Sequence, residues 1–329
     1  MKSILVIGWM VFLLGAAAPA RGTPLDAAKV DAFIRHMVKT YHFDEQSLRH
    51  VFATVQGQDK ILATMARPAE AKPWHEYAPL FLTRERIAAG AAFWTEHADA
   101  LRRAEERFGV PAEVVIAIIG VETFYGRIAG SYPVIEADAT LAFLYPPRAE
   151  FFRGELEQFL LLAREEQVDP LTLRGSYAGA MGLPQFIASS FRRYAIDFDG
   201  DGRRDIWNSA SDAIGSVANY LAENGWRRTA PIALPALRKD GDIDALAALG
   251  VKPQRTVAEL AAVGLTAVGY AEPDKLAAVI SLEQPSYREY WLGFDNFYVI
   301  TRYNRSPLYA MAVFQLAQEL RRAHPTGER

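Results

Sequence analysis

The chain has 329 residues, of which 50% are apolar and 12% aromatic, so it can bury a sizeable core and is not a disordered protein. A formal net charge of -3 gives no electrostatic footprint for nucleic acid, which argues against that class of partner. Cysteine is absent, and this excludes disulfides, thiol catalysis, thiolate metal sites and a cysteine-linked lipid anchor. The composition favours a neutral substrate, or one that is recognised by stacking and hydrogen bonds.

The first twenty residues have the pattern of a secretory signal peptide. Lys2 supplies a positive charge, residues 4–18 are apolar, and Ala18-Pro19-Ala20 is a small-x-small cleavage site. The alternative is a membrane anchor, but the strongly apolar part is shorter than the roughly 20 residues that a span needs. We therefore expect export, cleavage after about Ala20, and a mature chain without a transmembrane segment.

Hydrophobic periodicity predicts helices through the first third of the mature chain. Apolar residues recur at three- and four-residue spacing over residues 30–38, as in an amphipathic helix. Residues 44–45, Asp-Glu, are a start signal for a second, short helix, and the proline-containing stretch 66–79 is predicted to be a connector. The apolar positions of residues 83–107 predict one long helix that covers the core.

Residues 110–123 form the most buried-looking segment of the mature chain. Pro111 suits the first turn of a helix, and the following residues are apolar or small on every face. A helix of this kind is surrounded by protein. Glu122 lies at its far end, and Gly126 then breaks it.

A carboxyl group in this position has the properties of a proton donor. Desolvation and the negative end of the helix dipole should both raise the pKa of Glu122. Cleavage of a glycosidic bond requires protonation of the leaving oxygen, and an acid that is partly protonated near neutral pH can provide that proton. The structural alternative is an ion pair between Glu122 and a nearby cation such as Arg127.

Residues 176–182 are almost all small, and Gln185 follows them. Small residues allow the backbone to approach a ligand or another helix closely. In the first case Ser176, Tyr177 and Gln185 would be neutral hydrogen-bonding groups around a groove, suited to sugar hydroxyl and N-acetyl groups. In the second case the segment is a site of close helix packing with a polar edge.

Residues 197–202 resemble the start of an EF-hand calcium loop, with Asp at positions 1, 3 and 5 and Gly at position 6. Asp205 stands at position 9, but position 12 is Asn208 in place of the usual Glu, so Asp212 is the expected substitute. The candidate metal ligands are Asp197, Asp199, Asp201, Arg203 and Asp212. We favour structural calcium over the alternative, a solvated acidic turn.

The rest of the chain predicts further helices and a small β element. Helices are expected over residues 184–194, over residues 211–225 with a cap at Ser211-Asp212, and over residues 307–322. The strand candidates are residues 277–282, 287–292 and 297–301. Aromatic residues are dense here, and Tyr303-Asn304 is the pair most suited to face a sugar-binding groove.

Several of these segments together resemble the family B lytic transglycosylases of Gram-negative bacteria. Residues 121–127 are similar to the catalytic segment of that family, residues 176–186 to its second signature, and residues 197–212 to its calcium loop. Residues 216–220 resemble the helix after that loop, and residues 300–304 the late strand lining the groove. The similarity runs from about residue 27 to residue 322.

The resemblance implies a mainly helical α+β fold, in which a lysozyme-like helical core, an N-terminal helical lobe and a small β lobe surround a glycan-binding groove. We expect a signal peptide at 1–20, an N-terminal helical segment at 21–80, the catalytic core at 81–228, a small α/β lobe at 229–302 and a C-terminal helix at 303–329. It also implies roles for single residues. Glu122 matches the catalytic acid/base, the groove positions match Ser176, Tyr177, Gln185, Tyr220, Tyr303 and Asn304, and the calcium ligands match Asp197, Asp199, Asp201 and Asp212.

The implied reaction cleaves the β-1,4 bond between N-acetylmuramic acid and N-acetylglucosamine in peptidoglycan without water, and forms a 1,6-anhydro product. Glycosidases commonly use a second carboxylate, and the sequence shows no second candidate near Glu122. Two alternatives stay open: a hydrolytic muramidase on the same scaffold, and a non-catalytic peptidoglycan-binding protein. The expected partners are glycan strands and other cell-wall enzymes, and the expected state is a periplasmic monomer.

Overall fold

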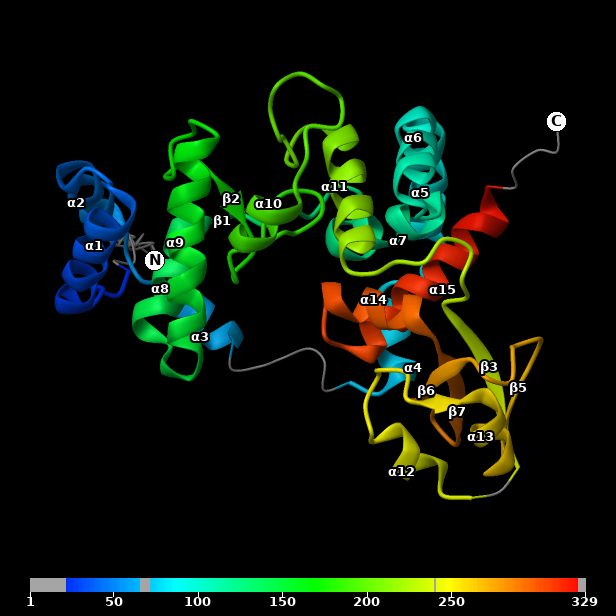
Figure 1. The fold of residues 1–329 in the computed structure, drawn as a ribbon. Coiled ribbons are helices and arrows are strands. Elements are labelled where there is room, and N and C mark those ends of the chain that lie inside the picture. Colours follow the sequence, from blue (N-terminus) through cyan, green and yellow to red (C-terminus); the bar gives the residue numbers. More distant parts are fainter. Residues whose placement is uncertain (1–21, 66–71, 240, 325–329) are drawn as a thin grey trace, which may run out of the picture.

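The computed structural model describes residues 22–65, 72–239 and 241–324. The predicted signal peptide lies outside these residues. The fold is mainly helical with a small antiparallel sheet, as predicted from the sequence (Figure 1).

The helices and 3-10 turns of the described chain are α1 (Ala27–Tyr41), α2 (Glu45–Thr54), α3 (Asp59–Met65), α4 (Trp74–Tyr77), η2 (Ala78–Leu80), α5 (Arg84–Glu96), α6 (Ala98–Phe108), α7 (Ala112–Thr123), α8 (Val134–Leu144), η3 (Pro146–Arg148), α9 (Ala149–Glu165), α10 (Ala188–Tyr194), α11 (Ala210–Glu223), α12 (Ile243–Ala247), α13 (Val257–Ala262), α14 (Asp295–Tyr303) and α15 (Pro307–Ala323). The strands are β1 (Tyr132–Pro133), β2 (Arg174–Gly175), β3 (Ala233–Arg238), β4 (Arg255–Thr256), β5 (Leu265–Ala267), β6 (Leu276–Glu283) and β7 (Arg288–Gly293).

Helix α7 is the centre of the main core. All of its residues are buried except Glu113 and Glu122, and α5, α6, α11 and α15 pack around it. This is the environment that its uniformly apolar sequence predicts, because a helix without a polar face has no side to present to water. The position of Glu122 is therefore fixed by four surrounding helices.

The N-terminal helices pack beside α8 and α9, at the left of Figure 1. The ring of Phe33 on α1 makes edge contacts with Phe52 on α2 and Phe143 on α8. Asp26 caps α1 and Asp44 caps α2 through backbone amides, which confirms the predicted start of the short second helix. The apolar stripe of α1 thus joins this segment to the core helices.

The sheet has the strand order β4-β6-β7-β3-β5, and its neighbouring strands are antiparallel. One of its faces packs on α12 and α13 in a separate hydrophobic cluster that includes Tyr290 and Leu292. On the other face, Trp291 of β7 makes an edge contact with Phe314 of α15. Because successive side chains of β7 point to opposite faces of the sheet, β7 contacts both the β lobe's own cluster and the main core. The predicted domain boundaries stay predictions.

The prediction of one long helix over residues 83–107 is wrong. The chain breaks at His97, which ends α5 and begins α6 with a non-helical backbone (φ -112, ψ 25). The break has a packing reason, since α5 packs against α15 and α7, whereas α6 packs against α11 and α7. A straight helix would not reach both neighbours.

Two predictions about where helices begin also fail. Pro184 does not start a helix, because Gln185 is left-handed (φ 50) and Phe186 exchanges backbone hydrogen bonds with Met181, so that α10 begins only at Ala188. The cap of α11 is Ser209 in place of the expected Ser211-Asp212.

The strand predicted at residues 297–301, including the part matched to a late strand of the family, belongs to helix α14. The helix buries Phe297, Val299, Ile300 and Thr301 against the core. This burial overrides the local preference of these residues for a strand. The strands predicted near residues 277–282 and 287–292 are confirmed as β6 and β7. Among the described residues, no helix combines the length and the apolar character needed to cross a bilayer.

Candidate active site

Glu122 lies in the last turn of α7, where the helix ends abruptly. Phe124 and Tyr125 both adopt left-handed backbone conformations (φ 51 and 59), and their amides donate to the carbonyls of Gly120 and Ile119. The neighbours of Glu122 in the chain are buried, whereas its own side chain keeps partial contact with solvent. The helix therefore delivers one carboxyl group to the edge of the core.

The carboxyl group of Glu122 accepts a 2.6 Å hydrogen bond from the hydroxyl of Tyr309, on α15. Burial raises the pKa of Glu122 to about 7, and the bond from Tyr309 opposes this rise. The alternative ion pair is not formed, because Arg127 pairs with Glu85 at 3.2 Å. A carboxyl group with this pKa is protonated in about half of the molecules near neutral pH.

Tyr309 is the site residue that the sequence reasoning missed. It lies in the apolar closing helix, so its sequence context is that of a core aromatic residue. Its ring stacks on Tyr303 at 6.4 Å with an interplanar angle of 8°. No spacing pattern links residues 122 and 309, and only the packing of α15 on α7 brings them together.

An aromatic cluster continues from Tyr309 into a groove. The rings of Tyr303 and Tyr220 lie 4.7 Å apart, and Phe186 contacts both. Backbone carbonyls fix the two tyrosine hydroxyls: Tyr303 donates to the carbonyl of Pro184 at 2.5 Å, and Tyr220 donates to the carbonyl of Arg302 at 2.6 Å. The rings are thus held by α11, α14, α15 and the loop before α10.

The groove has a volume of about 620 Å³ and contains four of the predicted groove residues: Gln185, Tyr220, Tyr303 and Asn304. Its remaining lining is Arg148, Phe151, Phe152, Ala178, Phe186, Ile187, Ser190, Arg302 and Arg305. The lining combines aromatic rings with neutral and cationic hydrogen-bonding groups. Such a surface can stack against sugar rings and hold their hydroxyl groups.

The loop of residues 176–186 is folded by its own hydrogen bonds. The Ser176 hydroxyl accepts the amides of Ala178 and Ala180, and the Gln185 amide nitrogen donates to the carbonyls of Ala129 and Gly182. Ser176 therefore organises a turn and does not line the groove, and Tyr177, which is exposed, is also outside its lining. Close backbone approach explains the small residues of this segment.

A side-chain hydrogen bond from Thr123 fixes this loop to α7. The hydroxyl of Thr123 donates to the carbonyl of Leu183 at 3.0 Å and accepts the amide of Gly126. Because Thr123 directly follows Glu122, the bond sets the position of the loop relative to the carboxyl group.

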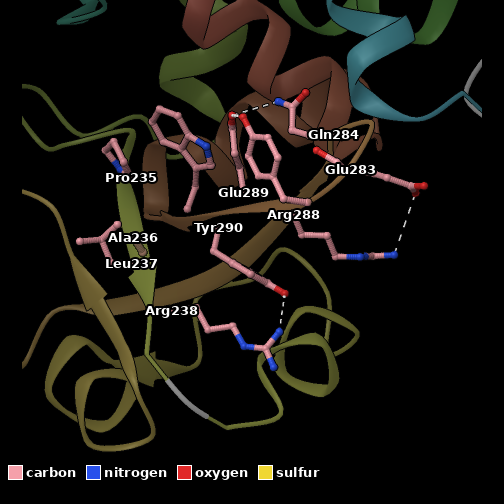
Figure 2. A pocket seen from close by; sticks show the side chains of 12 residues that line it. Pro235, Ala236, Leu237, Arg238, Glu283, Gln284, Arg288, Glu289 and Tyr290 are labelled. Carbon is pink, nitrogen blue, oxygen red and sulfur yellow. Dashed lines mark hydrogen bonds and ion pairs between the residues drawn. The ribbon is translucent and has the colours of Figure 1, made fainter.

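A larger cavity, of about 840 Å³, lies on the sheet and contains no comparable acid (Figure 2). Its Glu289 accepts hydrogen bonds from Gln284 and Tyr287, and its exposed Glu283 lies 4.0 Å from Arg288. These carboxylates are paired with donors at the protein surface. Glu122 differs from these carboxylates, because it has no ion pair in the described structure and its pKa is raised to about 7.

In the acidic loop, carboxylate oxygens of Asp197, Asp199 and Asp212 lie within 4.8 Å of one another. Asp212 is buried, and its oxygens accept the amides of Phe198 and Asp205. Asp197 accepts three amides of the turn itself.

Hard carboxylate oxygens of this kind suit calcium. Asp201 and Arg203 lie outside this three-carboxylate group among the described residues, and Asp201 instead accepts the amide of Arg203.

The family model described as "Transglycosylase SLT domain" matches residues 26–318. The chain belongs to this family. It is 44% identical over 296 residues to membrane-bound lytic murein transglycosylase B of Escherichia coli, an alignment that covers 87% of this chain and 81% of that protein.

Two solved structures of family members extend the similarity to the fold. Soluble lytic transglycosylase SltB1 of Pseudomonas aeruginosa is 50% identical, with a TM-score of 0.85 and coverage of 90% of this chain and 99% of that chain. Escherichia coli lytic transglycosylase Slt35, whose structure is a complex with calcium, is 42% identical, with a TM-score of 0.84 and coverage of 92% and 96%. The predicted fold class, a helical lysozyme-like core with a small β lobe, is confirmed by this match.

Proposed function

We propose that this protein is a lytic transglycosylase that cleaves the β-1,4 bond between N-acetylmuramic acid and N-acetylglucosamine in peptidoglycan glycan strands. The observation that carries the proposal is Glu122, a single carboxyl group with a pKa of about 7 and a tyrosine as its hydrogen-bond donor. It lies next to the aromatic cluster that leads into the groove. Membership of the transglycosylase family supports a lyase over a hydrolase and over a binding protein.

In the first step Glu122 acts as an acid. It transfers its proton to the bridging oxygen as the bond to the anomeric carbon breaks, and positive charge develops at that carbon. The acetamido group of the same sugar stabilises this charge. The step needs no second carboxylate from the protein.

In the second step the ionised Glu122 acts as a base. It takes the proton of the C6 hydroxyl, whose oxygen forms the new bond to the anomeric carbon and gives the 1,6-anhydro product. The catalyst regains the proton that it lost, so no water is consumed. One residue can do both tasks because its pKa lies near the working pH.

The groove residues have separate roles in this proposal. Tyr220, Tyr303 and Asn304 hold the sugars beside Glu122, and Gln185 shapes the wall of the groove through its two backbone bonds. Ser176 organises the turn below them, and the exposed Tyr177 meets the strand outside the groove.

Calcium is proposed as a structural ion of the acidic loop, held by Asp197, Asp199 and Asp212. Asp201 and the main chain at Arg203 complete the loop around this group. The ion supplies charge balance for carboxylates that would otherwise repel one another, and it takes no part in the reaction.

The mature chain is proposed to work in the periplasm as a monomer after removal of residues 1–20, alone or beside other cell-wall enzymes.

The test is digestion of purified peptidoglycan sacculi with the wild-type protein, Glu122→Gln and the control Glu113→Gln, followed by mass spectrometry of the products. Glu113 lies in the first turn of the same helix, where it pairs with the exposed Arg321. We expect anhydro-muropeptides from the wild type and the control, and none from Glu122→Gln. Products with reducing ends would establish a hydrolase, and activity retained in Glu122→Gln would refute the role of this residue.

A further inference from the structure

Asp138 is a buried carboxyl group beneath the loop that carries Gln185. It lies on α8, its side chain is 1% exposed, and neither of its oxygens has a hydrogen-bond partner in the described part of the chain. A Cβ atom added to Gly179 would lie 2.1 Å from the Oδ1 atom of Asp138. The carboxyl group is therefore packed directly against the backbone of this loop.

The surroundings of Asp138 disfavour a negative charge. The amides of Ala178 and Ala180 donate to the Ser176 hydroxyl, and the amide of Gly179 donates to the Ser176 carbonyl, so none of these three amides donates to Asp138. An isolated charge in such a place costs several kcal/mol. Burial raises the pKa of Asp138 well above its ordinary value.

The charged group that faces Asp138 is Glu155, which projects from the adjacent helix α9 and is itself buried. Its field raises the pKa of Asp138 further, and no other ionisable side chain of the described residues contributes. Glu155 accepts the amide and the hydroxyl of Ser189, at 2.9 and 2.7 Å. The two carboxyl groups thus lie under the two ends of one segment, Asp138 under Gly179 and Glu155 under Ser189.

We propose that Asp138 is a positioning residue of the transglycosylase: as an uncharged carboxylic acid it supports Gly179 and holds the loop of residues 176–186 in its groove-lining conformation. The inference rests on the proposed function of that groove. This support adds to the hydrogen bonds of the loop, whose bridges between Gly175 and Met181 and between Met181 and Phe186 are single pairs. Ionisation of Asp138 would place two negative charges beneath it and loosen it.

The first experiment measures binding of soluble glycan strands, prepared from sacculi, to Glu122→Gln protein and to the same protein carrying Asp138→Asn or Asp138→Ala. The Glu122→Gln background removes cleavage and the titration of the catalyst. We expect Asp138→Asn to bind like its parent at neutral pH and to keep binding at alkaline pH, where the parent loses it. Asp138→Ala should bind about tenfold more weakly, a factor that corresponds to about 1.4 kcal/mol.

The second experiment records the infrared carbonyl band of protonated carboxylic acids. In the Glu122→Gln background, which removes the partly protonated Glu122, a band from Asp138 should be present at neutral pH, disappear in Asp138→Asn and persist in Asp169→Asn, a substitution in an exposed turn. In Glu155→Gln the band should titrate at lower pH, because the field of Glu155 is removed.

The proposal is overturned if no band is lost in Asp138→Asn. It is also overturned if Asp138→Asn weakens glycan binding as much as Asp138→Ala does. Failure of the parent to bind glycan at all would refute the proposed function of the groove, while the infrared result would still decide whether the acid is neutral.

Discussion

The hydroxyl of Tyr309 lowers the proton affinity of Glu122, and Tyr309→Phe isolates this effect. The substitution removes one oxygen and keeps the ring that stacks on Tyr303. In the wild type the 2.6 Å bond stabilises the ionised carboxylate and holds the pKa of Glu122 down to about 7 against the effect of burial. Without the bond only the effect of burial is left, so the pKa of Glu122 must rise.

The size of this rise follows from the strength of the lost bond. A hydrogen bond to a charged group contributes about 1.5–3 kcal/mol, and about 1.4 kcal/mol corresponds to one pKa unit. The pKa of Glu122 should therefore rise by about one to two, from about 7 to between about 8 and 9. The ionised fraction at neutral pH would fall from about a half to a few per cent.

The assay is the pH dependence of kcat/KM on soluble glycan strands, which reports the pKa of the free enzyme. Since the first step needs protonated Glu122, activity falls as pH rises through this pKa, and in Tyr309→Phe the midpoint of that fall should move to higher pH. The matched control is Tyr220→Phe, whose hydroxyl donates to the Arg302 carbonyl and not to Glu122. An unchanged midpoint in Tyr309→Phe, or an equal change in Tyr220→Phe, would refute the reasoning.

Three further predictions concern stability. Because folding raises the pKa of Glu122 from 4.5 to about 7, ionisation of Glu122 opposes folding as pH rises through this interval. The free energy of unfolding of Glu122→Gln should match that of the wild type in acid and exceed it by up to about 3 kcal/mol above neutral pH. Denaturant titration at each pH measures this difference. Chelation of calcium should lower the melting temperature of the wild type but not that of Asp199→Asn, and equal curves with and without chelator in the wild type would count against a bound ion. Gly179→Ala should lower the free energy of unfolding by about 2–4 kcal/mol, because the backbone there is left-handed and the new methyl group collides with Asp138. Gly225→Ala should lower it by only about 1–2 kcal/mol, because Gly225 is left-handed but has open space around it. Equal losses would contradict the contact with Asp138.

The sequence predicted the centre of this fold because α7 is apolar on every side, a property that only a surrounded helix can have. The same pattern made Glu122 conspicuous, since an ionisable group is rare in such a segment. The acidic loop was also visible, because the alternation of Asp residues before Gly is a local pattern. The structure brings the carboxylates of Asp197, Asp199 and Asp212 together, while the roles of Asp201 and Arg203 stay predictions.

What the sequence did not predict depends on tertiary packing. The break at His97 serves two different neighbours of α5 and α6, and neither neighbour is encoded within residues 83–107. The helix at residues 295–303 overrides a run of β-prone residues because its buried face meets the core. Tyr309 was indistinguishable from the other apolar residues of its helix until α15 was placed against α7.

The electrostatics of the site depend on which groups are kept away from Glu122. Two arginines lie close in the sequence or in space, but Arg127 pairs with Glu85, and Arg86 donates to the carbonyl of Gly120 at 2.9 Å. A cation in contact with Glu122 would lower its pKa, because an opposite charge favours the ionised form. The acid of the first step would then be absent at neutral pH. Burial moderated by one neutral donor instead leaves the pKa near 7, where the same carboxyl group can give a proton and take one back.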